Sequence, residues 1–264
     1  MRRFSADYLK DTRTGMWDDR EALEPLALAD HSRVLDVGCG TGELTRVLRE
    51  ESAGRVVGLD ADRELLSHAT DGEYVQGDAT RLPFHEGSFD LVACQALLIN
   101  LPDPGKAVRE FARVSSDLVA VIEPDNSEVV VESTVESEGP LAQQARETYI
   151  EGVETDVTLG AAAADLFEDA ALTDVETRRY EHTRVVEPPY SEAALESAQR
   201  KATASRLAEQ RRTLEAGGMT PAEYDALRAD WREMGRDVVS EMQTGAYRRR
   251  AVVPFYVTVG RVRE

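Results

Sequence analysis

The sequence predicts an α/β fold in which helices cover both faces of a seven-stranded, mostly parallel sheet. In the first half of the chain, apolar runs of strand length alternate with segments of helical periodicity, as in parallel strands joined by crossover helices. Residues 34–37 form such a run and lead into three glycines, and residues 56–60 form the next run and end in Asp60. A strand, a glycine turn and an acidic residue roughly 20 residues further on are typical of a nucleotide-type cofactor site.

The remaining elements of the first half follow in a regular order. Residues 43–50 place leucine and valine side chains on one face, which predicts a helix after the glycine turn. The strands predicted after residue 60 are 74–75, 88–94 and 118–123. The turn Leu101-Pro-Asp-Pro104 precedes a helix predicted over residues 105–114.

The second half is predicted to add helices, a sixth strand and a closing strand. The predicted helices are 141–152, 161–170 and 191–215, and the predicted strands are 175–186 and 252–262. Gly217 and Gly218 end the third helix, and Thr220-Pro-Ala-Glu223 is a capping box that begins another. Apolar side chains recur at helical spacing from Tyr224 to Met242, which indicates a helix face packed in a core.

The glycine turn differs from a dinucleotide-binding turn in two respects. Gly38, Gly40 and Gly42 have the spacing G-x-G-x-G, whereas the dinucleotide fingerprint is G-x-G-x-x-G. Asp36 precedes the turn, and a carboxylate there would repel a pyrophosphate held at a helix N-terminus. A cofactor with positive charge suits this environment, and S-adenosylmethionine carries a sulfonium and an ammonium group.

Five ordered motifs over residues 34–124 resemble those of a known family. The motifs are VLDVGCGTGELT, VVGLDAD, GDATRLPF, SFDLVACQALL and the LPDP turn. Together they resemble class I S-adenosylmethionine-dependent methyltransferases, in particular the small-molecule type that includes ubiquinone and menaquinone C-methyltransferases. The resemblance implies a Rossmann-like sheet with an antiparallel last strand and S-adenosyl-L-methionine as cofactor. It covers the first half of the chain and is weak beyond it.

The resemblance also implies which residues line the methionine end of the cofactor. Asp36, Gly38, Cys39 and Gly40 would line it, and Gln95 would face the methionine or the transferring methyl group. The alternative for Asp36 is a carboxylate bonded only to backbone N–H groups of its own loop. The alternative for Gln95 is a residue at a helix N-terminus without a ligand.

Four further residues are implied for the nucleoside end. Asp60 would bind the ribose hydroxyls, and Ala61 would pack near the adenine. Asp78 would accept a hydrogen bond from the adenine amino group, with Ala79 beside it. The alternative for Asp78 is a turn-capping carboxylate.

The predicted domain organisation has four parts. An N-terminal helical cover spans residues 1–30, in which Tyr8 and Trp17 are candidates to touch ligand unless they belong to an ordinary helix packed on the sheet. The S-adenosylmethionine-binding methyltransferase core spans residues 31–190, and its closing strand spans residues 251–264. Residues 191–250 form a helical insertion, for which we hypothesise a lid over the substrate or a dimer contact.

No catalytic role is assigned from the sequence. A neutral oxygen or carbon nucleophile needs a base, and the candidates are Glu123, which ends the fifth predicted strand, and Asp125, which follows it. Tyr149 and Tyr190 are candidate substrate contacts. None of the four matches a catalytic motif, and for Glu123 a loop-holding role is the better interpretation.

The charge composition restricts the environment and the partners. The formal net charge is −19, with 50 acidic residues against 31 basic ones, and Lys10, Lys106 and Lys201 are the only lysines. Acidic, lysine-poor chains are typical of a high-salt cytoplasm, where salt screens self-repulsion. We interpret the chain as a halophilic protein of haloarchaeal origin. The charge argues against non-specific nucleic-acid binding, and Arg248-Arg-Arg250 is too short to change that.

Composition also argues against membrane and metal sites. The chain has no apolar run of about 18 residues and no signal peptide, so we expect a cytoplasmic protein with no membrane partner. Its four histidines form no ligand-spaced cluster, so we expect no metal. Cys39 and Cys94 are expected to be reduced thiols, with a redox pair as the alternative.

The sequence therefore predicts a methyltransferase that acts on a small-molecule acceptor, with a second copy of the chain as the candidate protein partner. The first alternative is an NAD(P)-dependent oxidoreductase on a similar sheet, which the glycine spacing and Asp36 disfavour. The second alternative is a non-catalytic cofactor-binding protein, because the motifs report binding and not chemistry.

Overall fold

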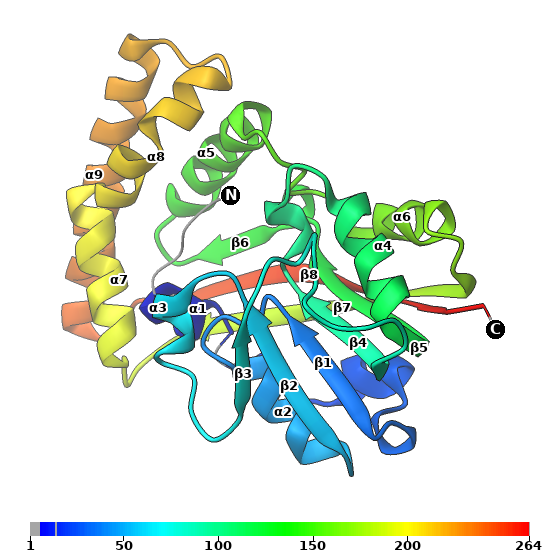
Figure 1. The fold of residues 1–264 in the computed structure, drawn as a ribbon. Coiled ribbons are helices and arrows are strands. Elements are labelled where there is room, and N and C mark those ends of the chain that lie inside the picture. The colour runs from blue at the N-terminus through cyan, green and yellow to red at the C-terminus, as the bar shows by residue number, and fades with distance from the viewer. Residues whose placement is uncertain (1–5, 14, 264) are drawn as a thin grey trace. The chain divides into compact units, whose positions relative to one another are not determined.

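The computed structural model describes residues 6–13 and 15–263, and it confirms the predicted α/β fold (Figure 1). The described strands form one sheet in the order β3-β2-β1-β4-β5-β8-β6, with β7 paired to β8. The strands are β1 (Arg33–Val37), β2 (Arg55–Asp60), β3 (Glu73–Gln76), β4 (Phe89–Gln95), β5 (Ser115–Pro124), β6 (Val130–Ser133), β7 (Thr173–Val186) and β8 (Arg249–Arg261). The first five are parallel, whereas β8 runs antiparallel to β5 and β6.

Helices of two kinds connect and extend these strands. The α-helices are α1 (Ala6–Arg13), α2 (Glu43–Glu51), α3 (Arg63–Leu66), α4 (Pro104–Val114), α5 (Glu138–Gly152), α6 (Ala163–Asp169), α7 (Glu192–Thr203), α8 (Ser205–Ala216) and α9 (Pro221–Thr244). The 3₁₀ turns are η1 (Glu21–Leu26), η2 (Leu28–Asp30), η3 (Leu98–Asn100), η4 (Asn126–Glu128) and η5 (Gly160–Ala162). No helix in the described part of the chain combines the length and the apolar character that a membrane span needs.

Contacts divide the chain into two compact units, each with its own core. The first unit comprises the described residues within 1–125, 159–180 and 255–264, and the second comprises residues 126–158 and 181–254. The second unit therefore groups α5 with α7, α8 and α9. The domain boundaries expected from the sequence, at residues 30, 190 and 250, stay a prediction.

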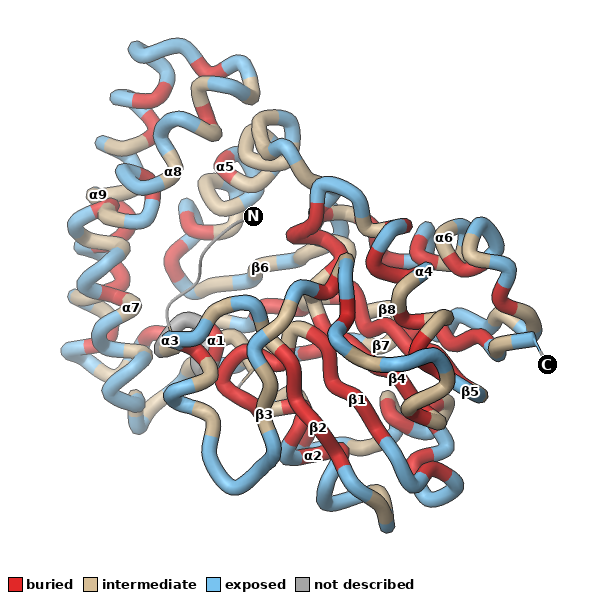
Figure 2. Tube along the Cα trace, viewed as in Figure 1, coloured by how far each residue is buried: buried red, intermediate tan, exposed pale blue. Residues whose placement is uncertain are grey.

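The core of the first unit follows from side-chain alternation along its strands. In β1, Leu35 packs with Phe111 of α4 on one face of the sheet, and Val34 packs with Leu48 of α2 on the other. Successive strand residues point to opposite faces, so one apolar run is covered by helices on both sides. Figure 2 shows the buried residues running along β1, β2 and β4. These buried strands position the loops that follow their carboxyl ends.

The sheet has one more strand among the described residues than the seven predicted, because β8 pairs with two segments along one edge. Its residues 255–261 pair with β5, and its residues 249–252 pair with β6. Pro254 lies between the two pairing stretches, where its missing N–H costs no ladder hydrogen bond. The additional strand is β6, and its four residues are too few for an alternation that could be recognised in the sequence.

The helix predicted over residues 191–215 is wrong in its continuity, because the structure divides it into α7 and α8. Ala204 adopts a left-handed conformation with φ 52° between the two helices and is fully buried. A Cβ on Gly235 of α9 would come within 2.3 Å of the backbone N of Ala202. The break between α7 and α8 therefore accompanies close packing of α7 against α9. The spacing of apolar residues within residues 191–215 does not reveal such packing between helices.

A charged cluster is buried in the second unit. Glu138 accepts hydrogen bonds from Lys201 Nζ (2.5 Å), Arg249 Nε (3.0 Å), Tyr247 (2.8 Å) and Ser133 (2.7 Å). Burial alone would raise the pKa of Glu138, but the two cations hold it below its ordinary value. The cluster joins β6, α5, α7 and β8, and its carboxylate is fully occupied by these partners.

Candidate cofactor site

The register of three neighbouring strands brings the predicted residues together. Val37, the last residue of β1, pairs with Leu59 of β2 on one side and with Cys94 of β4 on the other. The residues that follow each of these, which are Gly38, Asp60 and Gln95, therefore lie side by side at the carboxyl edge of the sheet. This is the edge at which open α/β sheets bind ligands, next to the point where the strand order reverses.

The glycine turn requires glycine for two separate reasons. Gly38, Gly40 and Gly42 all have positive φ, at 72°, 58° and 87°, a region that side chains disfavour. A Cβ at Gly38 would lie 2.8 Å from Cδ1 of Leu97, and one at Gly40 would lie 3.0 Å from Cδ1 of Leu9. The turn is thus closely approached by the segment after β4 and by α1.

Asp60 joins the end of β2 to the glycine turn. Its Oδ2 accepts a hydrogen bond from the N–H of Gly40 at 2.8 Å, and its Oδ1 accepts one from the N–H of Asp62 at 2.8 Å. Each carboxylate oxygen has a further lone pair, so these bonds leave room for hydroxyl donors. The ribose-binding role expected of Asp60 stays a prediction.

Asp36 lies beneath the turn. Its side chain is buried and its Oδ2 accepts a hydrogen bond from the Thr45 hydroxyl at 2.6 Å, which links β1 to α2. Burial raises the pKa of Asp36 to about 7, although the Thr45 hydrogen bond and the charge of Arg13 act in the opposite direction. The carboxylate is thus bonded to a helix side chain, a partner that the sequence interpretation did not include.

Arg13 is a site residue that sequence reasoning missed. Its side chain is 11% exposed, and its Nη1 lies 3.8 Å from Oε2 of Glu43 and near the position that a Cβ on Gly40 would take (3.4 Å). Nη1 has no hydrogen-bond partner among the described residues. Arg13 precedes Gly40 by 27 residues, and no sequence motif marks it, because only the fold brings α1 close to the glycine turn.

The other N-terminal candidates have different surroundings. Trp17 is buried with Leu23 and Leu44 in the core between α2 and the sheet, and its Nε1 has no hydrogen-bond partner in the described part. Tyr8 lies in α1, but its side chain is outside the described residues. Met16 places its Sδ 2.8 Å from Nε2 of Gln95.

Gln95 ends β4 and is only 3% exposed. It is a strand residue, which rules out the alternative of a helix N-terminus. Its Nε2 donates to the Met16 sulfur, and its Oε1 has no hydrogen-bond partner in the described residues. The site therefore contains a buried donor on Arg13 and a buried acceptor on Gln95, each with capacity for a ligand.

Glu123 holds the turn that follows Gln95. Its carboxylate accepts hydrogen bonds from the N–H groups of Leu97 (3.0 Å), Leu98 (2.8 Å) and Ile99 (3.4 Å). Burial raises its pKa to about 7, although these backbone donors act against the rise. The loop-holding interpretation of Glu123 agrees with this geometry, which leaves its carboxylate committed to backbone.

The nucleoside-end candidates lie after β2 and β3. Asp78 is exposed, and its Oδ1 accepts from both the N–H (2.8 Å) and the hydroxyl (2.9 Å) of Thr80, which is a turn-capping arrangement. Ala79 is buried, whereas Ala61 is exposed and its carbonyl accepts from Nε2 of Gln76 at 3.1 Å. The adenine roles of Ala61, Asp78 and Ala79 stay predictions.

The remaining candidates belong to the second unit or lack reactivity. The Tyr190 hydroxyl donates to the carbonyl of Tyr247 at 3.0 Å within the second unit, and Tyr149 packs against a core of that unit. Cys39 and Cys94 are free, and burial raises the pKa of both thiols. The described residues contain no group of three side chains arranged to hold a metal ion.

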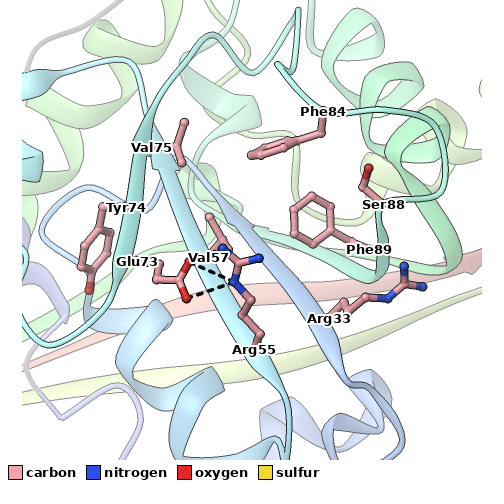
Figure 3. A pocket seen from close by; sticks show the side chains of 9 residues that line it. All are labelled: Arg33, Arg55, Val57, Glu73, Tyr74, Val75, Phe84, Ser88 and Phe89. Atoms are coloured by element: carbon pink, nitrogen blue, oxygen red, sulfur yellow. Dashed lines mark hydrogen bonds and ion pairs between the residues drawn. The ribbon is translucent and has the colours of Figure 1, made fainter.

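A hollow of about 500 Å³ opens elsewhere in the first unit, as Figure 3 shows. Apolar side chains, including Phe84 and Phe89, line it, and Arg55 is ion-paired with Glu73 at its rim. Arg33 and Arg55 are the first residues of β1 and β2, so the hollow lies toward the amino ends of these strands. Ligands of open α/β sheets bind at the opposite edge, and we do not assign the hollow to the cofactor.

Comparison with known proteins identifies the family of this site. Residues 35–117 match the family model of the methyltransferase domain. This segment is a class I S-adenosylmethionine-dependent methyltransferase domain. The match contains the glycine turn, Asp60, Asp78 and Gln95, and it confirms the resemblance drawn from the motifs.

Several curated relatives of the methyltransferase domain have names that describe quinone methyltransferases. A demethylmenaquinone methyltransferase of Lactiplantibacillus plantarum is 36% identical over 107 residues, which are 36% of this chain and 45% of the relative. A 2-phytyl-1,4-naphtoquinone methyltransferase of Thermosynechococcus vestitus is 37% identical over 102 residues, which are 35% of this chain and 45% of the relative. The chain thus spans less than half the length of these relatives.

Solved structures show the same fold over most of the chain. A candidate methyltransferase from Bacillus halodurans has a TM-score of 0.54 at 17% identity, with 93% of this chain and all of that chain covered. The YcgJ protein of Bacillus subtilis has a TM-score of 0.52 at 18% identity with the same coverage. At these identities the likeness extends to the fold alone.

Proposed function

We propose that this chain transfers the methyl group of S-adenosyl-L-methionine to a small-molecule acceptor. The observation that carries the proposal is a pair of buried polar atoms at the glycine turn, Arg13 Nη1 and Gln95 Oε1, that have no hydrogen-bond partner among the described residues. The methionine end of the cofactor has a carboxylate, which needs donors, and an ammonium group, which needs acceptors. One side chain of each kind is present, and each is nine-tenths buried or close to it.

Acidic side chains around the turn support a sulfonium cofactor over a dinucleotide. Asp36, Glu43 and Asp60 all lie at or beneath the turn, and Arg13 offsets only part of their charge. A pyrophosphate would be repelled there, whereas a sulfonium would be attracted. The turn also has positive φ at three glycines, which allows the backbone to approach a ligand closely.

S-adenosylmethionine, when bound, would supply an electrophilic methyl group with S-adenosylhomocysteine as the leaving group, and an O–H or N–H acceptor would release its proton to water. The residues of this chain would bind and orient the cofactor. Arg13 and Gln95 would hold the amino acid end, and Asp60 would hold the ribose while it keeps Gly40 in place. Asp78 and Ala79 would border the adenine. Such alignment is the main contribution of an enzyme to an in-line displacement.

The small-molecule assignment rests on the relatives, whose names describe methyltransferases of quinones. An aromatic, hydroxylated acceptor of that kind is our proposal for this chain. The net charge of −19 also disfavours RNA as acceptor, because a polyanion is repelled. We further propose that the protein acts in a high-salt cytoplasm, with a second copy as its candidate partner.

Labelled methyl transfer tests the proposal. The protein is incubated in molar KCl with S-adenosylmethionine labelled at the methyl group and with three acceptor mixtures: phenols and hydroquinones, bulk tRNA, and unfolded protein. We expect the unaltered protein to transfer label to the phenol and hydroquinone mixture. Asp60→Ala should abolish this transfer, because the substitution removes the carboxylate that fixes Gly40. Label confined to tRNA or protein would overturn the small-molecule assignment.

A further inference from the structure

The turn after β4 carries a buried amide that the cofactor assignment does not use. Asn100 is 7% exposed, and its Nδ2 donates to the carbonyl of Ala96 at 2.7 Å. Its Oδ1 has no hydrogen-bond partner in the described residues. A buried amide oxygen without a partner is unfavourable unless something else compensates for the loss of water, so it requires an explanation.

The orientation of this amide is fixed by its surroundings. Exchanging Nδ2 and Oδ1 would set the amide oxygen of Asn100 against the carbonyl oxygen of Ala96, two acceptors with no proton between them. Oδ1 is therefore the atom that faces away from Ala96. The N–H of Asn100 in turn donates to the carbonyl of Leu97 at 2.9 Å, which ties the residue into the same turn.

The turn combines an unusual backbone conformation with two contacts that hold it in place. Ala96 adopts a left-handed conformation with φ 47°, which residues other than glycine seldom adopt. The carboxylate of Glu123 accepts the N–H groups of the next three residues, and the Leu97 side chain lies so close to Gly38 that a Cβ there would clash. Strain that persists at a site marks a position the surrounding structure over-determines. Asn100 thus belongs to a held segment that follows Gln95 and approaches the glycine turn through Leu97.

We propose that Asn100 recognises the methyl acceptor by accepting a hydrogen bond, through Oδ1, from a hydroxyl or amino group of that molecule. The inference rests on the proposed function and adds the class of acceptor, one with an O–H or N–H donor. A carboxamide does not take up a proton near neutral pH, so Asn100 orients the acceptor and is not a base. Acceptors whose donor is replaced by an ether leave Oδ1 unpaired and are rejected.

Calorimetry on the full chain in molar KCl tests this inference in two steps. S-adenosylhomocysteine is titrated first, and its failure to bind would refute the proposed function. Matched pairs of probes are then titrated into the loaded protein: 1-naphthol against 1-methoxynaphthalene, and catechol against 1,2-dimethoxybenzene. The hydroxyl member of a pair is expected to bind roughly 10-fold or more tightly than its ether, the scale of a buried acceptor left unpaired.

Asn100→Leu and Asn100→Asp separate recognition from a structural role. Asn100→Leu is expected to reduce the hydroxyl-to-ether ratio to about one, whereas Asn100→Asp retains an acceptor oxygen and keeps part of the preference. A merely structural role would weaken both members of each pair alike. Equal binding of the pair members by the unaltered protein, binding of neither pair, or weakening by Asn100→Leu of S-adenosylhomocysteine but not of 5′-methylthioadenosine would overturn the proposal. The last outcome would assign Asn100 to the cofactor ammonium instead.

Discussion

Replacing Arg13 by methionine is expected to weaken S-adenosylmethionine binding while the fold is retained. The Arg13 side chain is 11% exposed, and its Nη1 has no hydrogen-bond partner among the described residues, so a bound carboxylate would gain a charge-assisted hydrogen bond with little solvent screening. Such a bond contributes about 1.5–3 kcal/mol. A difference of about 1.4 kcal/mol is tenfold in affinity, so the dissociation constant should rise roughly 10- to 150-fold. We expect the lower end of this range, because without Arg13 the nearby acidic groups, including Asp36, attract the sulfonium and ammonium groups of the cofactor more strongly.

Calorimetry with two ligands gives the sharpest form of this test. 5′-Methylthioadenosine has the same nucleoside but lacks the carboxylate and the ammonium group, so Arg13→Met should leave its affinity unchanged. Arg46→Met is a matched control, since Arg46 is 61% exposed and pairs with Glu50 on the surface of α2. Equal weakening of both ligands by Arg13→Met would refute the placement of the carboxylate at Arg13.

Three further predictions concern stability. Burial raises the pKa of Glu123 from 4.5 to about 7, so the stability that Glu123 contributes is fully present below about pH 4.5 and is lost as the pH rises through about 7. The free energy of unfolding in urea should therefore fall between pH 4.5 and pH 8, and Glu123→Gln should remove about 3 kcal/mol of that fall. An unchanged pH dependence in Glu123→Gln would count against this prediction. Gly40→Ala and Gly245→Ala should each lower the free energy of unfolding by about 1 kcal/mol, because both glycines have positive φ. Only Gly40→Ala should also weaken the binding of S-adenosylmethionine, since Gly40 lies in the glycine turn, whereas a Cβ at Gly245 meets nothing within 4 Å. The net charge of −19 predicts a melting temperature that rises between 0.1 and 2 M KCl, over which the screening length falls from about 10 Å to below 3 Å, and a flat dependence would contradict the high-salt interpretation.

The features that the sequence predicted are those written in contiguous residues. The glycine turn and Asp60 belong to one strand–turn–helix–strand segment, so their spacing alone indicates a cofactor site. The capping box of α9 is equally local, and the structure has both of its hydrogen bonds between Thr220 and Glu223. Motifs of this kind need no knowledge of tertiary packing.

Features made by distant segments were not predictable. Arg13 reaches the glycine turn, and Asn100 gains its significance from an unpaired atom, which no spacing encodes. The bond from Thr45 to Asp36 and the break at Ala204 likewise depend on packing between elements. Deleting residues 191–250 would remove Leu207 and Leu214 from the core they share with α5, so point variants test the lid hypothesis for this insertion better than a deletion.

Titration of the unaltered chain with S-adenosylmethionine, S-adenosylhomocysteine and NADH in molar KCl decides which cofactor the glycine turn binds. We expect one site for the two adenosyl compounds, because Asp60 and the glycine turn lie at one carboxyl edge of the sheet, and no heat from NADH. Binding of NADH without S-adenosylmethionine, or of neither, would contradict this expectation.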